Sequence, residues 1–93
     1  MSESSHSIER VGVVGAGTMG SGIVQVIAQA GILVTMVDRR EQDLQRGLAT
    51  IAKSLERLEK KGALDVGASD SIRARISISI DTTSLTGANL VIE

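Results

Sequence analysis

Three glycines near the start of the chain have the spacing of a phosphate-binding turn. Residues 11–20 read Val-Gly-Val-Val-Gly-Ala-Gly-Thr-Met-Gly, so Gly15, Gly17 and Gly20 form the pattern G-x-G-x-x-G after a short apolar run. In such a turn Gly15 permits a sharp change of direction, Gly17 lets a pyrophosphate approach the backbone, and Gly20 lets the next helix pack closely. A helix that begins there points free N–H groups and a partial positive charge at the phosphates. We therefore predict that a dinucleotide contacts Gly15, Ala16, Gly17, Thr18, Met19 and Gly20.

A carboxylate follows at the distance expected for the ribose of such a ligand. A second apolar run, residues 33–37, is followed by Asp38, 18 positions after Gly20. The typical spacing is about 20 residues, and the carboxylate then accepts hydrogen bonds from the adenosine ribose. Asp38 should also repel a 2′-phosphate, although an arginine nearby, Arg39 or Arg40, can hold one. The glycines alone also fit a tight turn without a ligand, but together with Asp38 they favour NAD as the cofactor.

The chain offers no catalytic or metal-binding constellation. Its only histidine, His6, lies within the polar, serine-rich residues 1–10, which we expect to form a flexible tail. A catalytic base is the alternative role for His6, but a solvated tail residue is the more common situation. The absence of cysteine excludes disulfides and cysteine metal sites. We therefore predict no catalytic residue and no metal ligand in this chain.

Composition and charge narrow the class of protein further. The 93 residues are 42% apolar, which is enough for one small domain with a core of Val, Ile, Leu, Ala and Met. The net charge is −1 without a basic stripe, which argues against nucleic-acid binding. No apolar run approaches the roughly 20 residues of a membrane span, and no secretory signal opens the sequence. We expect a cytoplasmic protein that binds neither membranes nor nucleic acid.

The periodicity of apolar residues predicts a strand, a helix and a second strand in the first part of the chain. We expect a strand at 11–14, a helix at 19–30 that ends before Gly31, and a strand at 33–37. The second strand is so apolar that we expect it to be covered on both faces, as in a parallel sheet. The expected buried face of the helix consists of Met19, Ile23, Val26, Ile27 and Ala30.

The second part of the chain continues the alternation. Residues 41–61 predict a long helix, and its apolar residues at helical spacing are Leu44, Leu48, Ile51, Leu55 and Leu58. The remaining expected elements are a connection at 64–69, a short helix at 70–75 capped by Ser69 or Asp70, a half-buried strand at 76–80, a polar turn at 81–89, and a fourth strand that begins at 90–93.

This order of elements predicts an α/β fold. It is that of a Rossmann-like doubly wound parallel sheet, of which the chain contains only the first half (β-α-β-α-β-β). In the common strand order 3-2-1-4-5-6, the fourth strand lies beside the first, and its apolar edge would be uncovered at residue 93. We therefore expect residues 11–93 to be a partial NAD-binding domain, and the chain to be a poorly stable piece of a longer protein.

Several stretches resemble one enzyme family. They are Val-Val-Gly-Ala-Gly-Thr-Met-Gly-Ser-Gly-Ile at 13–23, Lys-Ser-Leu-Glu at 53–56, Lys-Lys-Gly at 60–62 and Leu-Val-Ile-Glu at 90–93. They are similar to the N-terminal domain of the 3-hydroxyacyl-CoA dehydrogenases, in particular to the bacterial 3-hydroxybutyryl-CoA branch. The glycine pattern is shared by many families, whereas Thr-Met-Gly-Ser-Gly-Ile and the Lys-Ser-Leu helix are more diagnostic. The likeness covers the chain from about residue 10 to its end.

The resemblance implies an oxidoreductase of fatty acid metabolism and β-oxidation, which transfers a hydride from C3 of a 3-hydroxyacyl-CoA to NAD. In the family a histidine oriented by a glutamate removes the hydroxyl proton. That pair and the helical domain that forms the homodimer lie beyond position 93, so this chain alone should be inactive. The family's contacts to coenzyme A fall on Ser54 and Lys61, seven positions apart on one helix face. The alternatives are a solvated Ser54 and a Lys61 that only complements the helix dipole.

Other functions use parts of the same pattern. A stand-alone NAD-binding or NAD-sensing module would use the glycines and Asp38 without catalysis. A flavin-binding oxidase shares the glycine turn but has no use for the Lys-Ser-Leu helix. A methyltransferase usually has an acidic residue just before the first glycine, where this chain has Val13 and Val14. The dehydrogenase is therefore the function we expect, with the NAD module as its alternative.

Overall fold

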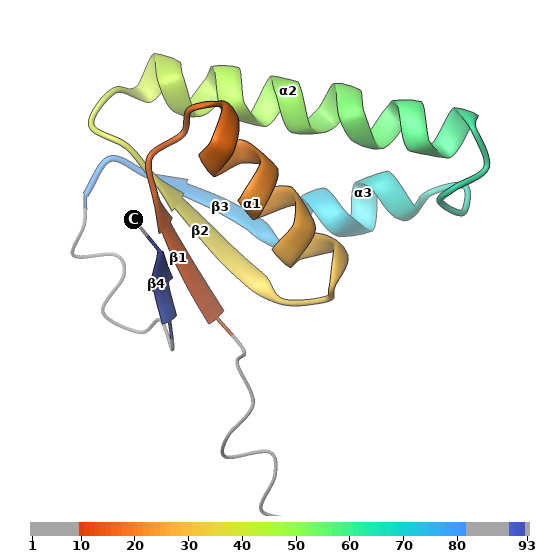
Figure 1. Ribbon diagram of the computed structural model, residues 1–93, viewed down its shortest axis with the longest axis horizontal. Coiled ribbons are helices and arrows are strands. Elements are labelled where there is room, and N and C mark those ends of the chain that lie inside the picture. The colour runs from red at the N-terminus through yellow and green to blue at the C-terminus, as the bar shows by residue number, and fades with distance from the viewer. Residues whose placement is uncertain (1–9, 82–89, 93) are drawn as a thin grey trace, which may run out of the picture.

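The computed structural model describes residues 10–81 and 90–92, which form a parallel sheet with helices packed on it (Figure 1). Its elements are β1 (Arg10–Val14), α1 (Thr18–Gln29), β2 (Leu33–Val37), α2 (Glu41–Lys60), α3 (Ala68–Arg73), β3 (Ile76–Ser79) and β4 (Leu90–Ile92). The predicted order of strands and helices is confirmed, and each boundary differs by at most two residues. The predicted tail at 1–10, with His6, lies outside the described residues apart from Arg10, which begins β1. The predicted turn at 81–89 lies outside them apart from Asp81.

The strands are all parallel and lie in the order β3-β2-β1-β4. This is the order of the first half of a doubly wound fold, which confirms the predicted α/β class. β4 pairs with β1, where Leu90 lies opposite Val11 and Ile92 opposite Val13. Because the strands are parallel, their carboxyl ends share one edge of the sheet, which is where ligands bind in folds of this kind.

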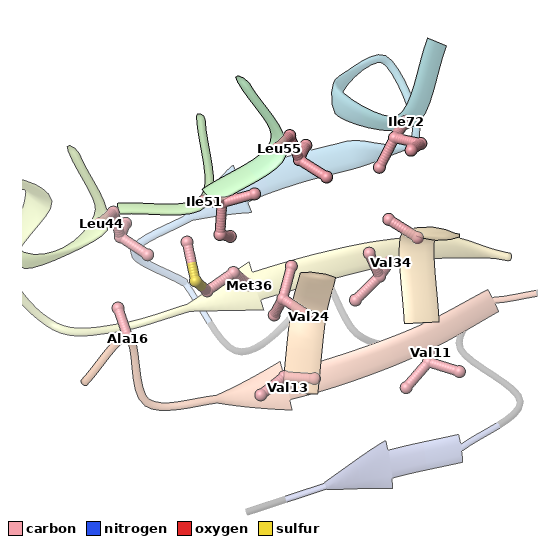
Figure 2. Packing of buried hydrophobic residues seen from close by; sticks show 11 residues of the cluster. Val11, Val13, Ala16, Val24, Val34, Met36, Leu44, Ile51, Leu55 and Ile72 are labelled. Carbon is pink, nitrogen blue, oxygen red and sulfur yellow. The ribbon is translucent and has the colours of Figure 1, made fainter. Parts of the chain in front are cut away.

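The hydrophobic core lies between the sheet and the helices (Figure 2). Val13 of β1 and Met36 of β2 are register partners, and both side chains are fully buried. α2 covers this layer with Leu44, Ile51 and Leu55, which are buried as their helical spacing predicts. Burial of each such side chain stabilises the fold by about 1.5–3 kcal/mol. The core therefore fixes the turn after β1 relative to α2.

The buried face of α1 differs from the predicted one. Met19 is 80% exposed and Val26 is 67% exposed, and Ala30 is an exposed C-cap outside the helix, so the prediction is wrong for these three residues. The buried residues of the helix are Ser21, Val24 and Ala28. Val24 and Ala28 are apolar but each lies one position after a residue of the predicted face, so that face is rotated from the true one. Ser21 completes the buried face because its hydroxyl donates a hydrogen bond to the Ala16 carbonyl.

Within the described residues, helices cover one face of the sheet. α1, α2 and α3 share a single core with Val13, Val34 and Met36. On the opposite face Leu33 is 47% exposed and Val91 is 43% exposed. The prediction that residues 33–37 are covered on both faces is therefore wrong at Leu33. An apolar run shows that a strand favours burial, but it does not show which elements cover each face.

Two long-range hydrogen bonds hold α3 in place. Its N-cap is Gly67, in the left-handed region at φ +90°, so no side chain caps the helix locally. Instead, the Ser69 backbone N–H donates to the Glu59 carboxylate of α2 at 2.7 Å. The Arg75 guanidinium, just after α3, donates to the Ala28 carbonyl of α1 at 2.9 Å. The predicted local cap is therefore wrong, and α3 is anchored by tertiary contacts that its own sequence does not reveal.

Candidate functional site

The turn from β1 into α1 is built as the glycine spacing predicts. Gly15 has φ +106°, a left-handed conformation that favours glycine, and its N–H donates to the Val37 carbonyl at 2.7 Å. A Cβ on Gly20 would overlap the carbonyl oxygen of Gly15. The close packing expected at Gly20 is therefore present, and Gly20 packs against the backbone of the turn at Gly15. This contact holds the first turn of α1 against the end of β1.

Gly17 is the N-cap of α1 and faces open space. Its backbone is extended, at φ −68° and ψ −173°, and a Cβ built on it would have no heavy atom within 4 Å. The first helical hydrogen bond runs from the Ser21 N–H to the Gly17 carbonyl at 2.8 Å. The N–H groups of Thr18, Met19 and Gly20 precede that donor, so they are free of intrahelical acceptors. With no acidic residue in its first turn, α1 presents an uncompensated positive end at this point.

Asp38, just after β2, is tied directly to the glycine turn. One carboxylate oxygen accepts the Ala16 N–H at 2.9 Å, and the other accepts the Arg40 N–H at 3.3 Å. These hydrogen bonds, that from Ala16 first, lower the pKa of Asp38 below its ordinary value. Asp38 is therefore ionised at neutral pH, and each carboxylate oxygen keeps a further lone pair for a ligand hydroxyl. Sequence reasoning places Asp38 near the ribose but misses its bond to a residue 22 positions away.

The turn lies between two hollows of different character. One, of about 330 Å³, reaches from Gly17 and Asp38 to α2, where Asp43 and Arg46 form an ion pair at 3.4 Å. The other, of about 360 Å³, lies over the end of β1 and beside Ile92 of β4, with mainly apolar walls. An elongated ligand with phosphates at its middle suits this arrangement, since the free N–H groups of α1 lie between a polar and an apolar hollow.

The two residues assigned to coenzyme A lie on the far half of α2. Ser54 is half-buried and lines a third hollow, of about 330 Å³, between α1 and α2. Lys61 is the exposed C-cap of α2, and it does not line that hollow. Lys53 and Arg57 line it instead, and the sequence prediction did not include them. The structure therefore keeps Ser54 and Lys61 on one helix but gives them different surroundings.

Residues 10–81 and 90–92 contain neither a membrane-spanning helix nor a cluster of metal-binding side chains. None of the helices there combines the length and the apolar character that crossing a membrane requires. Nor does that part of the chain bring together three His, Cys, Asp or Glu side chains around a possible metal position. At the glycine turn, the groups that can meet a ligand are the backbone N–H groups at the start of α1 and the Asp38 carboxylate.

Comparison with known proteins connects this geometry to a family. Residues 10–93 match the model of the 3-hydroxyacyl-CoA dehydrogenase NAD binding domain. A probable 3-hydroxybutyryl-CoA dehydrogenase of Deinococcus radiodurans is 40% identical over 84 residues, which cover 90% of this chain and 30% of that protein. A 3-hydroxybutyryl-CoA dehydrogenase of Mycobacterium tuberculosis is 42% identical over 89 residues, which cover 96% of this chain and 31% of that protein. The chain thus spans about 30% of the length of these curated relatives.

Solved structures agree with the sequence matches. The (S)-3-hydroxybutyryl-CoA dehydrogenase of Ralstonia eutropha is 46% identical with a TM-score of 0.88, and the match covers 91% of this chain and 30% of that one. The 3-hydroxybutyryl-CoA dehydrogenase of Escherichia coli is 30% identical with a TM-score of 0.88, over 91% of this chain and 18% of that one. The chain therefore belongs to the family of 3-hydroxyacyl-CoA dehydrogenase NAD-binding domains, whose cofactor is NAD.

Proposed function

We propose that this chain is the cofactor-binding part of an enzyme that oxidises a 3-hydroxyacyl-CoA at C3 with NAD. The observation that carries the proposal is the glycine turn: free helix N–H groups stand beside a carboxylate that is bonded to the same turn. The named relatives act on 3-hydroxybutyryl-CoA, and we propose a substrate of that class for this protein. The stand-alone NAD module remains the alternative.

In this proposal the backbone of residues 15–20 holds the cofactor's pyrophosphate. The N–H groups at the start of α1 and its positive end attract the phosphates, and the open space at Gly17 lets them approach. Asp38 accepts hydrogen bonds from the adenosine ribose through lone pairs that Ala16 and Arg40 leave available. NAD, when bound, supplies the hydride acceptor. The residues of this chain bind it and orient it across the carboxyl edge of the sheet.

The acyl-CoA substrate is proposed to contact α2. Ser54 can hydrogen-bond to the coenzyme A part of the substrate from the hollow that it lines. Lys61, exposed at the end of α2, can meet a phosphate as a point charge. The resemblance supports both assignments, and the seven-residue separation keeps the pair about 10 Å apart along one helix.

Proton transfer is proposed to use residues outside the described part of the chain, which contains no histidine. In the family a histidine and a glutamate perform this step, and general base catalysis by such a pair contributes about 10²–10⁴-fold to the rate. The resemblance also supports a cytoplasmic homodimer for the full-length protein. These assignments are proposals about the whole enzyme, of which this chain supplies the cofactor site.

The test is turnover by the full-length protein. Mixed with NADH and acetoacetyl-CoA, it should consume NADH, and the same mixture without acetoacetyl-CoA should leave NADH intact. Tight NADH binding without turnover of any 3-ketoacyl-CoA would instead favour the NAD-sensing module. Failure to bind NADH would contradict the cofactor site itself.

A further inference from the structure

The peptides of the glycine turn are held by side chains from two other elements. The Ala16 N–H is bonded to Asp38 after β2, and the Ala16 carbonyl accepts the Ser21 hydroxyl of α1 at 3.1 Å. Ala16 and Ser21 are both buried, so solvent does not compete for the hydroxyl bond. In Figure 2 the Ala16 side chain points from the turn toward Leu44 of α2.

The Ser21 bond determines the direction of a backbone donor. In a trans peptide the C=O and the N–H point in opposite directions, and the described residues contain no cis peptide. Because the Ala16 carbonyl points toward Ser21, the Gly17 N–H of the same peptide points away from it. The Ser21 backbone N–H holds the Gly17 carbonyl in the same manner, at 2.8 Å, which turns the Thr18 N–H outward. The Ser21 hydroxyl therefore orients one donor of the turn, the Gly17 N–H, and the helical backbone of residue 21 orients the next.

Gly47 of α2 completes this arrangement. A Cβ on Gly47 would lie 2.8 Å from the Ser21 hydroxyl, 3.2 Å from the Ala16 carbonyl oxygen and 3.2 Å from the Met36 terminal methyl. Gly47 is itself buried, so α2 lies directly over this buried hydrogen bond. Any side chain at this position would press on the hydroxyl and on the carbonyl that it holds.

We propose that Ser21 is a positioning residue for the cofactor, whose hydroxyl acts through the peptide that joins Ala16 to Gly17, and that Gly47 provides the space for this hydroxyl. This inference rests on the proposed function, since it assumes that the turn binds the pyrophosphate of NAD. Donors that already point at the phosphates do not have to be ordered on binding, so the hydroxyl bond contributes to affinity through preorganisation. Ser21 does not need to touch the cofactor for this effect.

The test separates phosphate binding from ribose binding in the full-length protein. NADH binding is measured by nicotinamide fluorescence, and bound NADH is then displaced with ADP, which carries a diphosphate, or with adenosine, which carries none. Ser21→Ala should weaken NADH and ADP by about 3- to 10-fold, as expected for one lost hydrogen bond. Adenosine should change by less than about 2-fold. The matched control is Ser69→Ala, another buried serine, in α3, which should leave all three affinities unchanged.

A double-mutant cycle provides the second readout. Gly47→Ala should weaken ADP binding in the wild-type background and do so less in the Ser21→Ala background, because its nearest clash is with the Ser21 hydroxyl. Three results would each overturn the inference while leaving NADH binding by the wild type intact. They are equal losses of affinity for ADP and adenosine, no loss of ADP affinity in Ser21→Ala, and strictly additive effects of the two substitutions on ADP affinity. Absence of NADH binding by the wild type would contradict the proposed function as well.

Discussion

The two proposed binding surfaces, the glycine turn and the far half of α2, are built in different ways. The turn offers backbone N–H groups whose directions are set by tertiary hydrogen bonds to Asp38 and Ser21. The far half of α2 offers side chains, Ser54 and Lys61, on the surface of a regular helix. The first surface exists only when several elements are correctly packed, whereas the second exists wherever the helix forms. Substitutions in the turn should therefore have large effects, and substitutions on α2 should have small ones.

The largest effect is expected from Gly20→Ala. The new Cβ would overlap the Gly15 carbonyl oxygen, which belongs to backbone and cannot rotate away. We expect a loss of about 3 kcal/mol or more in the free energy of unfolding, as for severe overpacking, together with loss of NADH binding. Denaturant unfolding of the full-length protein measures the loss of stability, and fluorescence titration measures NADH binding. A variant of normal stability would show that the helix does not pack on the turn as described.

Gly17→Val should remove binding while sparing the fold. The position is open, with an extended backbone that valine adopts easily, but the isopropyl group would occupy the space of the pyrophosphate. We expect NADH affinity to fall by about 100-fold or more, with a change in the free energy of unfolding below about 1 kcal/mol. Gly22→Val is the matched control, because Gly22 is equally open but lies within α1. If Gly17→Val bound NADH normally, the assignment of the phosphate turn would be wrong.

A smaller effect is expected from Lys61→Ala on the α2 surface. An exposed cation contributes about 0–1 kcal/mol to an ionic contact, so the KM for acetoacetyl-CoA should rise by no more than about 5-fold. NADH affinity should not change, because Lys61 lies at the opposite end of α2 from the turn. Lys60→Ala, one position earlier on the same helix, is the control. Equal changes in KM for the two variants would indicate a general charge effect and argue against a specific contact.

The smallest effect concerns the pH dependence of stability through Asp38. Its folded-state pKa is lowered from the ordinary value of 3.8, because the carboxylate accepts the Ala16 and Arg40 N–H groups. A carboxylate of this kind stabilises the fold fully above its unfolded pKa, and the contribution is lost as the pH falls through the folded pKa. The stability difference between wild type and Asp38→Asn should thus be constant from about pH 5 to 8 and shrink below about pH 4. If this stability difference varied near neutral pH, the pH dependence would have to come from a group other than Asp38.

The sequence predicts the fold well because its signals are local. Apolar periodicity and glycine positions suffice to place the strands and helices, and Gly15 adopts the left-handed turn that the pattern requires. The strand order follows because the glycine pattern is typical of one topology, in which the fourth strand returns beside the first. The part of the site that the sequence predicts is the glycine turn, which depends on backbone conformation and on positions that have no side chain.

The contacts that sequence reasoning misses are those between distant residues. The bond from Ala16 to Asp38 joins positions 22 apart, and no spacing rule selects that donor. Ser21 interrupts the apolar pattern of α1, so periodicity excludes it from the buried face although a tertiary hydrogen bond makes its burial favourable. From the sequence alone, Gly47 is only a residue that weakens its helix. The structure explains the glycine, because a Cβ there would contact the glycine turn and Ser21. A polar or glycine residue within an otherwise regular helix face is thus a signal to look for a partner.

The most direct test of the central claim, that this turn and Asp38 form an NAD site, is the relative affinity for NADH and NADPH. The full-length protein is titrated with each nucleotide by fluorescence, and Asp38→Asn is measured in parallel. The ionised carboxylate should accept a hydrogen bond from the 2′-hydroxyl and repel a 2′-phosphate. We therefore expect NADH to bind at least about 10-fold more tightly than NADPH, and Asp38→Asn to reduce that ratio. Equal or tighter binding of NADPH by the wild type would contradict the account.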